Sequence, residues 1–222
     1  MQLSSSALSL YNDCPRCFYL DRKFKLPRPR GIFSSLPIGI DKILKEKLDT
    51  FRGSLPPQLQ VKELEGFELY TGSELSKMRN WKTNPLKMKD AEGNTIVGAF
   101  DDLLHNPEKD LYAILDVKTK GSRPDQAYCE KYYQKQVDIY SRFLEVGGKT
   151  LAPFAVLLYF WCEPGENELV TFKSEPFFLT PFPGDAELLF KDAISLLEGD
   201  MPGPGIDCEY CGYHEKLSVY ND

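Results

Sequence analysis

Hydrophobic and polar positions follow two periodicities along the chain, one typical of helices and one typical of strands. Apolar residues at helical spacing predict helices over residues 4–11, 37–49, 126–146 and 186–197. Apolar runs bounded by turn residues predict strands over residues 66–71, 95–104, 111–118, 154–161 and 170–179. Because strands and long helices are interspersed, we expect an α/β fold in which helices flank a central mixed sheet.

Length and composition favour one globular domain over residues 1–222. The chain has 42% hydrophobic and 27% charged residues, enough apolar material for a single core and too much for a disordered segment. Its formal charge is −6, which argues against a surface that binds nucleic acid or anionic membrane indiscriminately. A local basic groove remains compatible with that charge.

The N-terminus lacks the cationic and long apolar segments of a secretory signal. The longest apolar run, residues 151–162, contains Pro153 and is shorter than the roughly 20 residues needed to span a bilayer. We therefore expect a cytoplasmic protein without a membrane anchor, in a compartment where thiols stay reduced.

The most informative chemistry lies in a predicted hairpin in the middle of the chain. If its turn is centred between Glu108 and Lys109, residues whose numbers sum to 217 face each other across the two strands. Asp101 then opposes Asp116 on one face. Lys118 lies two residues beyond Asp116 and shares that face. The hairpin is therefore predicted to gather two carboxylates and one ammonium group.

Two carboxylates at that separation repel each other, and a divalent cation relieves the repulsion because Mg²⁺ prefers carboxylate oxygens. A lysine beside a metal-bound water can orient or deprotonate it. Such a set can hydrolyse a phosphodiester. The alternative is a solvated sheet face with an incidental Asp–Lys ion pair, and spacing alone does not decide between the two.

Four of the six cysteines form two C-x-x-C pairs at opposite ends of the chain: Cys14, Cys17, Cys208 and Cys211. Two such pairs predict one four-cysteine metal centre that joins the chain ends. Zn²⁺ and a [4Fe–4S] cluster both accept four thiolates. The alternative is two unrelated thiol pairs or disulfides. Cys129 and Cys162 stand alone, and we expect both to be buried apolar residues.

A basic, proline-rich stretch follows the first cysteine pair. Its four cations are Lys23, Lys25, Arg28 and Arg30. With the interleaved aromatic residues Phe18, Tyr19 and Phe24, they are candidates to line a groove for single-stranded nucleic acid. The alternative is a solvated linker.

The hairpin motif resembles the core of the PD-(D/E)XK nuclease superfamily. The resemblance rests on a strand with Gly98 and Asp101, a turn, and an apolar strand that ends in Asp116 and Lys118. It implies a restriction-endonuclease-like core. The family order also places Asp41 where a metal-ligating histidine is usual, and a carboxylate can still ligate Mg²⁺ or Mn²⁺.

Further motifs are similar to the RecB-like branch, which includes CRISPR-associated exonucleases. Gln136 and Tyr140 match its Gln-x-x-x-Tyr motif, and residues 3–20 match its opening Ser…Cys-Pro-x-x-Phe segment. Iron–sulfur members commonly use one N-terminal and three C-terminal cysteines, whereas this chain has two and two. The resemblance implies a [4Fe–4S] cluster, with Zn²⁺ as the alternative.

Carried over by position, the resemblance implies a role for each motif residue. Asp101, Asp116 and the Val117 carbonyl would ligate Mg²⁺ or Mn²⁺, with Asp41 as a further candidate. Lys118 would position or activate the attacking water. Gln136 and Tyr140 would orient the active-site strand or touch the DNA backbone.

The implied function is a metal-dependent DNA nuclease, an exonuclease acting on DNA ends or single strands. The alternative is a catalytically weak, nuclease-fold subunit that binds or processes DNA within a CRISPR, recombination or phage replication complex. RNA is a third possible substrate, since no motif distinguishes a 2′-hydroxyl.

Overall fold

The structure is a computed structural model that describes residues 1–29, 31, 35–80, 82, 86–167 and 169–218. The helices are α1 (Ser5–Asp13), α2 (Pro15–Phe24), α3 (Ser35–Asp49), α4 (Leu75–Met78), α5 (Gln126–Val146), α6 (Pro183–Glu198) and α7 (Glu209–Ser218). The strands are β1 (Gln2–Ser4), β2 (Glu68–Leu69), β3 (Leu86–Lys89), β4 (Thr95–Gly98), β5 (Asp102–Asn106), β6 (Leu111–Lys120), β7 (Ala155–Pro164) and β8 (Val170–Leu179).

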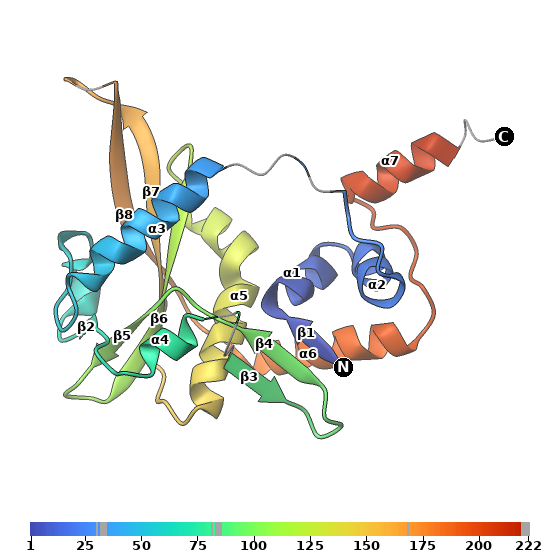
Figure 1. The fold of residues 1–222 in the computed structure, drawn as a ribbon, viewed down its shortest axis with the longest axis horizontal. Coiled ribbons are helices and arrows are strands. Elements are labelled where there is room, and N and C mark those ends of the chain that lie inside the picture. Colours follow the sequence, from blue (N-terminus) through green and yellow to red (C-terminus); the bar gives the residue numbers. More distant parts are fainter. Residues whose placement is uncertain (30, 32–34, 81, 83–85, 168, 219–222) are drawn as a thin grey trace.

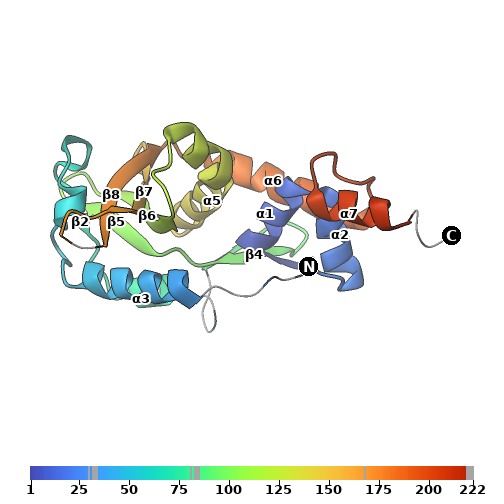
Figure 2. The ribbon, with the colours of Figure 1, turned by 90° about the horizontal axis from the view of Figure 1, so that it is seen from above.

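The central sheet has five strands in the order β2-β5-β6-β7-β8. β6 and β7 are parallel, and the other neighbours are antiparallel, so the sheet is mixed as predicted. Helix α5 covers one face and α3 lies against the other (Figures 1 and 2). A second, three-stranded sheet, β1-β4-β3, was not predicted. The α/β class and the flanking helices are confirmed.

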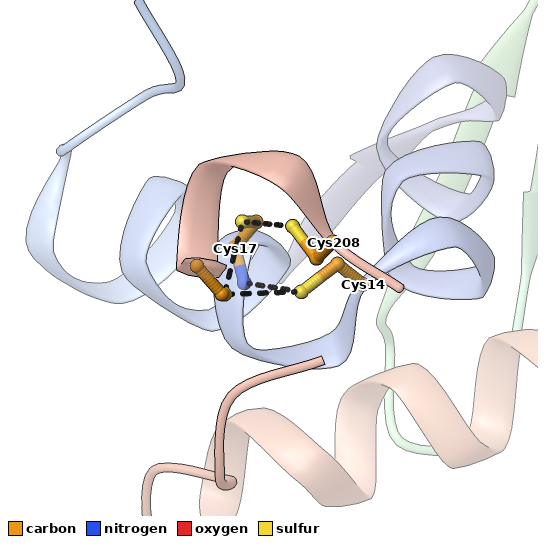
Figure 3. A group of neighbouring side chains, drawn as sticks. Cys14, Cys17 and Cys208 are labelled. Carbon is orange, nitrogen blue, oxygen red and sulfur yellow. Dashed lines mark hydrogen bonds between the residues drawn. The ribbon is translucent and has the colours of Figure 1, made fainter. Parts of the chain in front are cut away.

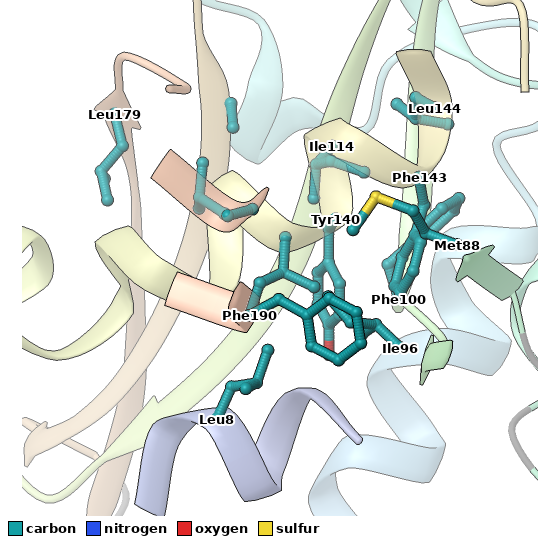
Figure 4. Packing of buried hydrophobic residues seen from close by; sticks show 14 of the residues in the cluster. Leu8, Met88, Ile96, Phe100, Ile114, Tyr140, Phe143, Leu144, Leu179 and Phe190 are labelled. Carbon is teal, nitrogen blue, oxygen red and sulfur yellow. The ribbon is translucent and has the colours of Figure 1, made fainter. Parts of the chain in front are cut away.

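Alternation along β6 divides the core into two layers. Ile114 belongs to the apolar cluster that includes α5, whereas Leu115 belongs to the cluster that includes Leu48 of α3. The α5 layer also holds the rings of Tyr140 and Phe143, whose centroids are 6.5 Å apart (Figure 4). Because side chains alternate between faces along a strand, this pattern directs the residues that follow Leu115 alternately toward α5 and α3.

Helix α5 begins and ends at the predicted residues because both ends have strong local signals. Asp125 precedes the helix, and its carboxylate accepts a hydrogen bond from the backbone N–H of Tyr128 at 2.7 Å. After Val146 the chain reaches Gly147 and then Gly148, whose φ of +79° favours glycine. These boundaries place the long helix directly across the strand that carries Asp116.

The prediction of one strand over residues 95–104 is wrong. The chain pairs as β4 in one sheet and as β5 in the other, with a break over residues 99–101. At the end of β4, a Cβ on Gly98 would lie 2.8 Å from the Phe143 ring, so glycine allows the close packing of β4 on α5. The break leaves Asp101 outside both ladders, between the two sheets.

Two expectations about burial are wrong. Cys162 is exposed, because it lies near the far end of the β7–β8 pair, one residue beyond the part of β7 that pairs with β6, whereas Cys129 is buried as expected. Ile43 of α3 is one of the apolar residues whose helical spacing predicts the helix over residues 37–49, and we expect such residues to face the core, but it is 65% exposed and Leu48 is that helix's buried residue. Helix α3 therefore contacts the sheet mainly through its C-terminal end.

The two ends of the chain pack together beside the sheet. Helices α1 and α2 contact α6, and α7 lies next to α2 (Figures 1 and 2). The Tyr19 hydroxyl donates a hydrogen bond to the Gly199 carbonyl at 3.1 Å. None of the helices in the described residues is both long and apolar enough to cross a bilayer.

Candidate functional site

The β5–β6 hairpin has the register that the sequence predicts. Asp102 pairs with Leu115 and Asn106 pairs with Leu111, so paired residue numbers sum to 217. Asp101 lies one residue before this ladder and is held differently. Its Oδ2 accepts a hydrogen bond from the Val117 N–H at 3.0 Å, which fixes the Asp101 carboxylate against β6.

Asp116 and Lys118 lie together on the α5 side of β6. Lys118 Nζ is 2.5 Å from Asp116 Oδ2, and Asp116 is only 3% exposed. The same ammonium donates a hydrogen bond to Gln136 Oε1 at 2.9 Å, and Gln136 Nε2 donates to the Tyr140 hydroxyl at 2.9 Å. The structure therefore connects four of the predicted catalytic residues in one chain of contacts.

The electrostatics of this pair reflect its burial. Removal from water raises the pKa of Asp116 to about 6, and repulsion from Asp101 adds to the shift although Lys118 opposes it. Burial alone would lower the pKa of Lys118, but attraction to Asp116 outweighs it and the net shift is upward. Lys118 therefore stays an ammonium at neutral pH, beside a carboxylate whose charged form is disfavoured mainly by burial.

Lys45 of α3 is a second cation at the site, and the sequence analysis missed it. Its Nζ lies 2.7 Å from Asp101 Oδ1 and 2.9 Å from Asp41 Oδ2, so it bridges the two carboxylates. Attraction to both outweighs the effect of burial and raises the pKa of Lys45. The signal was available, because Lys45 is one helical turn from Asp41.

The carboxylates of Asp41, Asp101 and Asp116 are the type of ligand that suits a hard divalent cation. Asp116 Oδ2 is buried and makes no hydrogen bond of acceptable geometry, and the Lys45 ammonium stands as a positive charge between Asp41 and Asp101. Carboxylate oxygens are the ligands that Mg²⁺ and Mn²⁺ prefer. The three carboxylates do not all lie within 4.8 Å of one another; among the described residues, only the four cysteines form such a group.

The four cysteines converge as the sequence predicts (Figure 3). Cys14 and Cys17 flank the start of α2, while Cys208 and Cys211 flank the start of α7. The Sγ–Sγ distances are 3.7 Å for Cys14–Cys211, 3.6 Å for Cys17–Cys208 and 3.9 Å for Cys17–Cys211. The cluster links the N-terminal and C-terminal segments of the chain.

These distances match one tetrahedrally coordinated ion. With Zn–S bonds of about 2.3 Å, the sulfurs of a tetrahedral site stand roughly 3.8 Å apart. In a [4Fe–4S] cluster each thiolate binds a different iron, which requires a wider spacing. The geometry of the thiols therefore resembles a single-ion site more than a cluster site.

The polypeptide packs tightly around the cysteines. A Cβ on Gly205 would lie 2.9 Å from Cys14 Sγ, so only glycine fits where the tail passes the centre. Burial raises the pKa of Cys208, but hydrogen bonds from the Cys211 backbone and from neighbouring thiols outweigh it and bring that pKa to about 7. Arg28 Nη2 donates to Cys208 Sγ at 3.3 Å, which further favours a thiolate.

The basic N-terminal residues contact the protein itself. Lys23 Nζ donates to the Leu197 carbonyl at 3.0 Å, and Lys25 Nζ donates to the Arg22 carbonyl at 3.0 Å. Arg28 pairs with Asp13 at 2.5 Å in addition to its bond with Cys208. Arg30 lies outside the described residues. The structure thus places these cations around α2 and the cysteines, and it does not bring them to the hairpin.

One buried ion pair near the site had no clear signal in the sequence. Asp102 is fully buried and accepts two hydrogen bonds from Arg52, at 2.7 and 2.6 Å. Arg52 also donates to the Tyr70 carbonyl at 3.3 Å. This pair ties the chain after α3 to the start of β5, and it thereby supports the position of Asp101.

One protein family and several solved structures are similar to this chain. A sequence model of the PD-(D/E)XK nuclease superfamily matches residues 41–215. No protein of curated function matches the chain significantly. The solved structures that resemble it include SSO0001 and a candidate exonuclease from Eubacterium rectale, with TM-scores of 0.47 and 0.49 and identities of 14% and 13%. Each comparison covers 96% of this chain, and 84% and 87% of the other chains. Because the family model spans the hairpin, α5 and the second cysteine pair, the chain belongs to the PD-(D/E)XK nuclease superfamily.

Proposed function

We propose that this protein is a metal-dependent deoxyribonuclease that acts as an exonuclease on DNA ends or single strands. The observation that carries the proposal is the buried Asp116–Lys118 pair, held by Gln136 and adjacent to Asp101. A sheet face with an incidental ion pair does not explain why the Asp116 carboxylate is buried and why the partly buried Lys118 ammonium is held by a side chain of α5. A site that hydrolyses a phosphodiester does explain this arrangement, because it needs a carboxylate to hold a metal ion and a fixed positive charge near the phosphate.

Asp101 and Asp116 would hold a divalent cation with the Val117 carbonyl, and Asp41 is the further candidate ligand. When bound there, Mg²⁺ or Mn²⁺ supplies charge that polarises the phosphate and lowers the pKa of a coordinated water. Burial, with repulsion from Asp101, raises the pKa of Asp116, so a cation bound in this place would stabilise a carboxylate charge that the protein leaves poorly solvated.

Lys118 orients the nucleophile in this proposal. An ammonium group has three N–H donors, of which one faces Asp116 and one binds Gln136. The third is available to the attacking water or to a phosphate oxygen. Attraction to Asp116 raises the pKa of Lys118, so Lys118 enters the site as a hydrogen-bond donor and a positive charge. Gln136, itself anchored on Tyr140, keeps the ammonium at that position.

A second function is favoured by Lys45, whose ammonium lies between Asp41 and Asp101. If that ammonium keeps metal out, the protein is a catalytically weak subunit that binds DNA within a larger assembly. Lys45→Met separates the two functions. If the weak-subunit function holds, the variant should bind Mn²⁺ more tightly and cleave DNA faster than wild type. If the nuclease function holds, wild type should already cleave DNA efficiently.

The cysteine centre is proposed to hold one tetrahedral ion, with Zn²⁺ as the first candidate and a [4Fe–4S] cluster as the alternative. The sulfur spacing supports the single ion. Such a centre would tie residues 1–222 into a single domain. Elemental analysis of protein purified without oxygen distinguishes the two. One zinc per chain without colour supports the proposal, whereas about four irons with broad visible absorption contradict it.

The nuclease proposal is tested by cleavage of end-labelled single- and double-stranded DNA. We expect products with Mg²⁺ or Mn²⁺, none with EDTA, and progressive shortening from an end. Lys118→Met should reduce the rate about 100-fold or more. The matched control is Lys109→Met, in the exposed turn of the same hairpin. Wild-type cleavage that persists in Lys118→Met would contradict the assignment.

A further inference from the structure

Three tyrosines at the start of α5 form a row of rings beside the candidate active site. The ring centroids of Tyr128 and Tyr132 are 4.6 Å apart, and those of Tyr128 and Tyr133 are 6.5 Å apart. Tyr132 is 57% exposed, whereas Tyr128 and Tyr133 are partly buried. The row therefore begins at solvent and runs into the protein.

Each ring in this row carries a lysine over its face. Lys131 Nζ lies 5.3 Å from the Tyr132 centroid, and Lys120 Nζ lies 4.2 Å from the Tyr128 centroid. The third lysine is Lys118, 4.7 Å from the Tyr133 centroid. The inner end of the row is thus the same ammonium that contacts Asp116. We call these six residues the tyrosine–lysine strip.

The outer lysines of the strip are not neutralised by carboxylates. Within the part of the chain that the structure describes, no ion pair involves Lys120 or Lys131, and Lys120 Nζ has a long hydrogen bond of 3.5 Å to Ser122 Oγ. Arg28, by contrast, is paired with Asp13. The charge of the strip is therefore available to an anionic ligand.

We propose that the tyrosine–lysine strip binds single-stranded DNA and leads it to Lys118. Bases can stack on an exposed aromatic ring without regard to sequence, and lysines beside the rings can contact the phosphates. The strip joins both features in a line that ends at the Asp116–Lys118 pair. This inference rests on the proposed nuclease function, for which it supplies the path of the substrate.

The exposed ring is the point at which the proposal is tested. The measurement is the fluorescence anisotropy of a labelled oligo-dT of about 12 nucleotides, a length within the usual site size, with EDTA present so that no DNA is cleaved. Tyr132→Ala should weaken binding about fivefold or more, since stacking is lost. Tyr132→Phe keeps the ring and should bind as wild type does.

The matched control is Tyr213→Ala. Tyr213 is also exposed, at 66%, but it lies in α7, away from the sheet (Figure 1). That variant should bind DNA as wild type does. A thermal unfolding scan of each variant shows whether a loss of binding reflects a loss of fold; Tyr132→Ala, at an exposed position, should unfold at the wild-type temperature.

The lysines give an independent readout. Removing Lys120 and Lys131 together by alanine substitution should make log Kd less dependent on log salt concentration, by about 0.7 for each charge removed. Lys216→Ala in α7 should leave that slope unchanged. Equal affinity of wild type and Tyr132→Ala, or an unchanged slope in the double lysine variant, would overturn the strip as the binding site.

These outcomes separate the strip from the nuclease proposal. If wild type binds oligo-dT through Tyr132 but does not cleave with Mg²⁺ or Mn²⁺, the strip is supported and the nuclease proposal fails. If wild type cleaves single strands but Tyr132→Ala binds them equally well, the nuclease proposal stands and the strip fails. If wild type does not bind oligo-dT at all, the strip is overturned.

Discussion

The hairpin site and the cysteine centre are built in opposite ways. The hairpin site gathers charge: Asp116 is buried beside Lys118, and Asp101 is bridged to Asp41 by Lys45. The cysteine centre gathers four thiols from the two ends of the chain, and the Arg28 guanidinium donates a hydrogen bond to Cys208. The hairpin site places several charged groups close together, whereas the cysteine centre joins residues from the two ends of the chain.

This difference indicates which property each site should control. A buried, incompletely compensated carboxylate costs stability and is retained where function needs it. A four-thiolate centre contributes its metal-binding free energy to folding. We therefore expect changes in the hairpin to affect chemistry at nearly constant stability. Changes in the cysteine centre should affect stability first.

The largest effect is expected from replacing the second cysteine pair by serine, as Cys208→Ser with Cys211→Ser. The variant should lose its metal, and the free energy of unfolding should fall by several kcal/mol, because metal-binding free energies reach on the order of 10 kcal/mol in small zinc domains. Elemental analysis and urea unfolding measure both changes.

The matched control for that change is Cys162→Ser, an exposed cysteine outside the centre. It should keep its metal and wild-type stability. Loss of metal without a loss of stability in the double variant would show that the centre does not hold the chain ends together. The expectation that the cysteine centre controls stability would then fail.

An intermediate effect is expected from Gln136→Leu. The substitution removes the acceptor for the Lys118 ammonium and the donor to Tyr140. The rate constant for DNA cleavage should fall about tenfold, roughly 1.4 kcal/mol, while the affinity for DNA stays the same. Single-turnover kinetics and oligonucleotide binding measure the two quantities. A change in DNA affinity alone would mean that Gln136 contacts the substrate and does not position Lys118.

The smallest effect is expected from Arg28→Ala. The sequence analysis predicts that Arg28 binds nucleic acid, whereas its contacts in the structure indicate that it supports the cysteine centre. Its guanidinium donates to Cys208 Sγ and stacks on the Tyr210 ring at 4.6 Å. Loss of a charge-assisted hydrogen bond should speed metal release to a chelator about threefold to tenfold. DNA affinity should not change. Weaker DNA binding with unchanged metal release would restore the role predicted from the sequence.

Local signals in the sequence predicted most of the fold. The hairpin register follows from the position of a turn, and the bounds of α5 follow from the periodic apolar positions and the glycines after Val146. The convergence of the cysteines follows from their spacing. Each of these features is specified by a short segment of the chain or by the spacing of an uncommon residue type.

The parts that could not be predicted depend on contacts between distant residues. The ring of Phe143 packs closely against Gly98 at the end of β4, and the pairing of Arg52 with Asp102 joins the chain after α3 to β5. Lys45 reaches Asp101 only because α3 packs against β6. Spacing places Lys45 one helical turn from Asp41, but it carries no information about the packing of α3 that brings Lys45 to Asp101.

The most direct test of the account is the cleavage rate of end-labelled single-stranded DNA by Asp116→Asn with Mn²⁺. The amide is nearly isosteric, and its oxygen can still accept a hydrogen bond from the Lys118 ammonium, so the variant should remain folded at the assay temperature, which a thermal unfolding scan checks. We predict a rate at least about 100-fold below wild type, with Glu108→Gln in the turn of the same hairpin retaining full activity. Cleavage by Asp116→Asn at the wild-type rate would contradict the assignment of the active site to this hairpin.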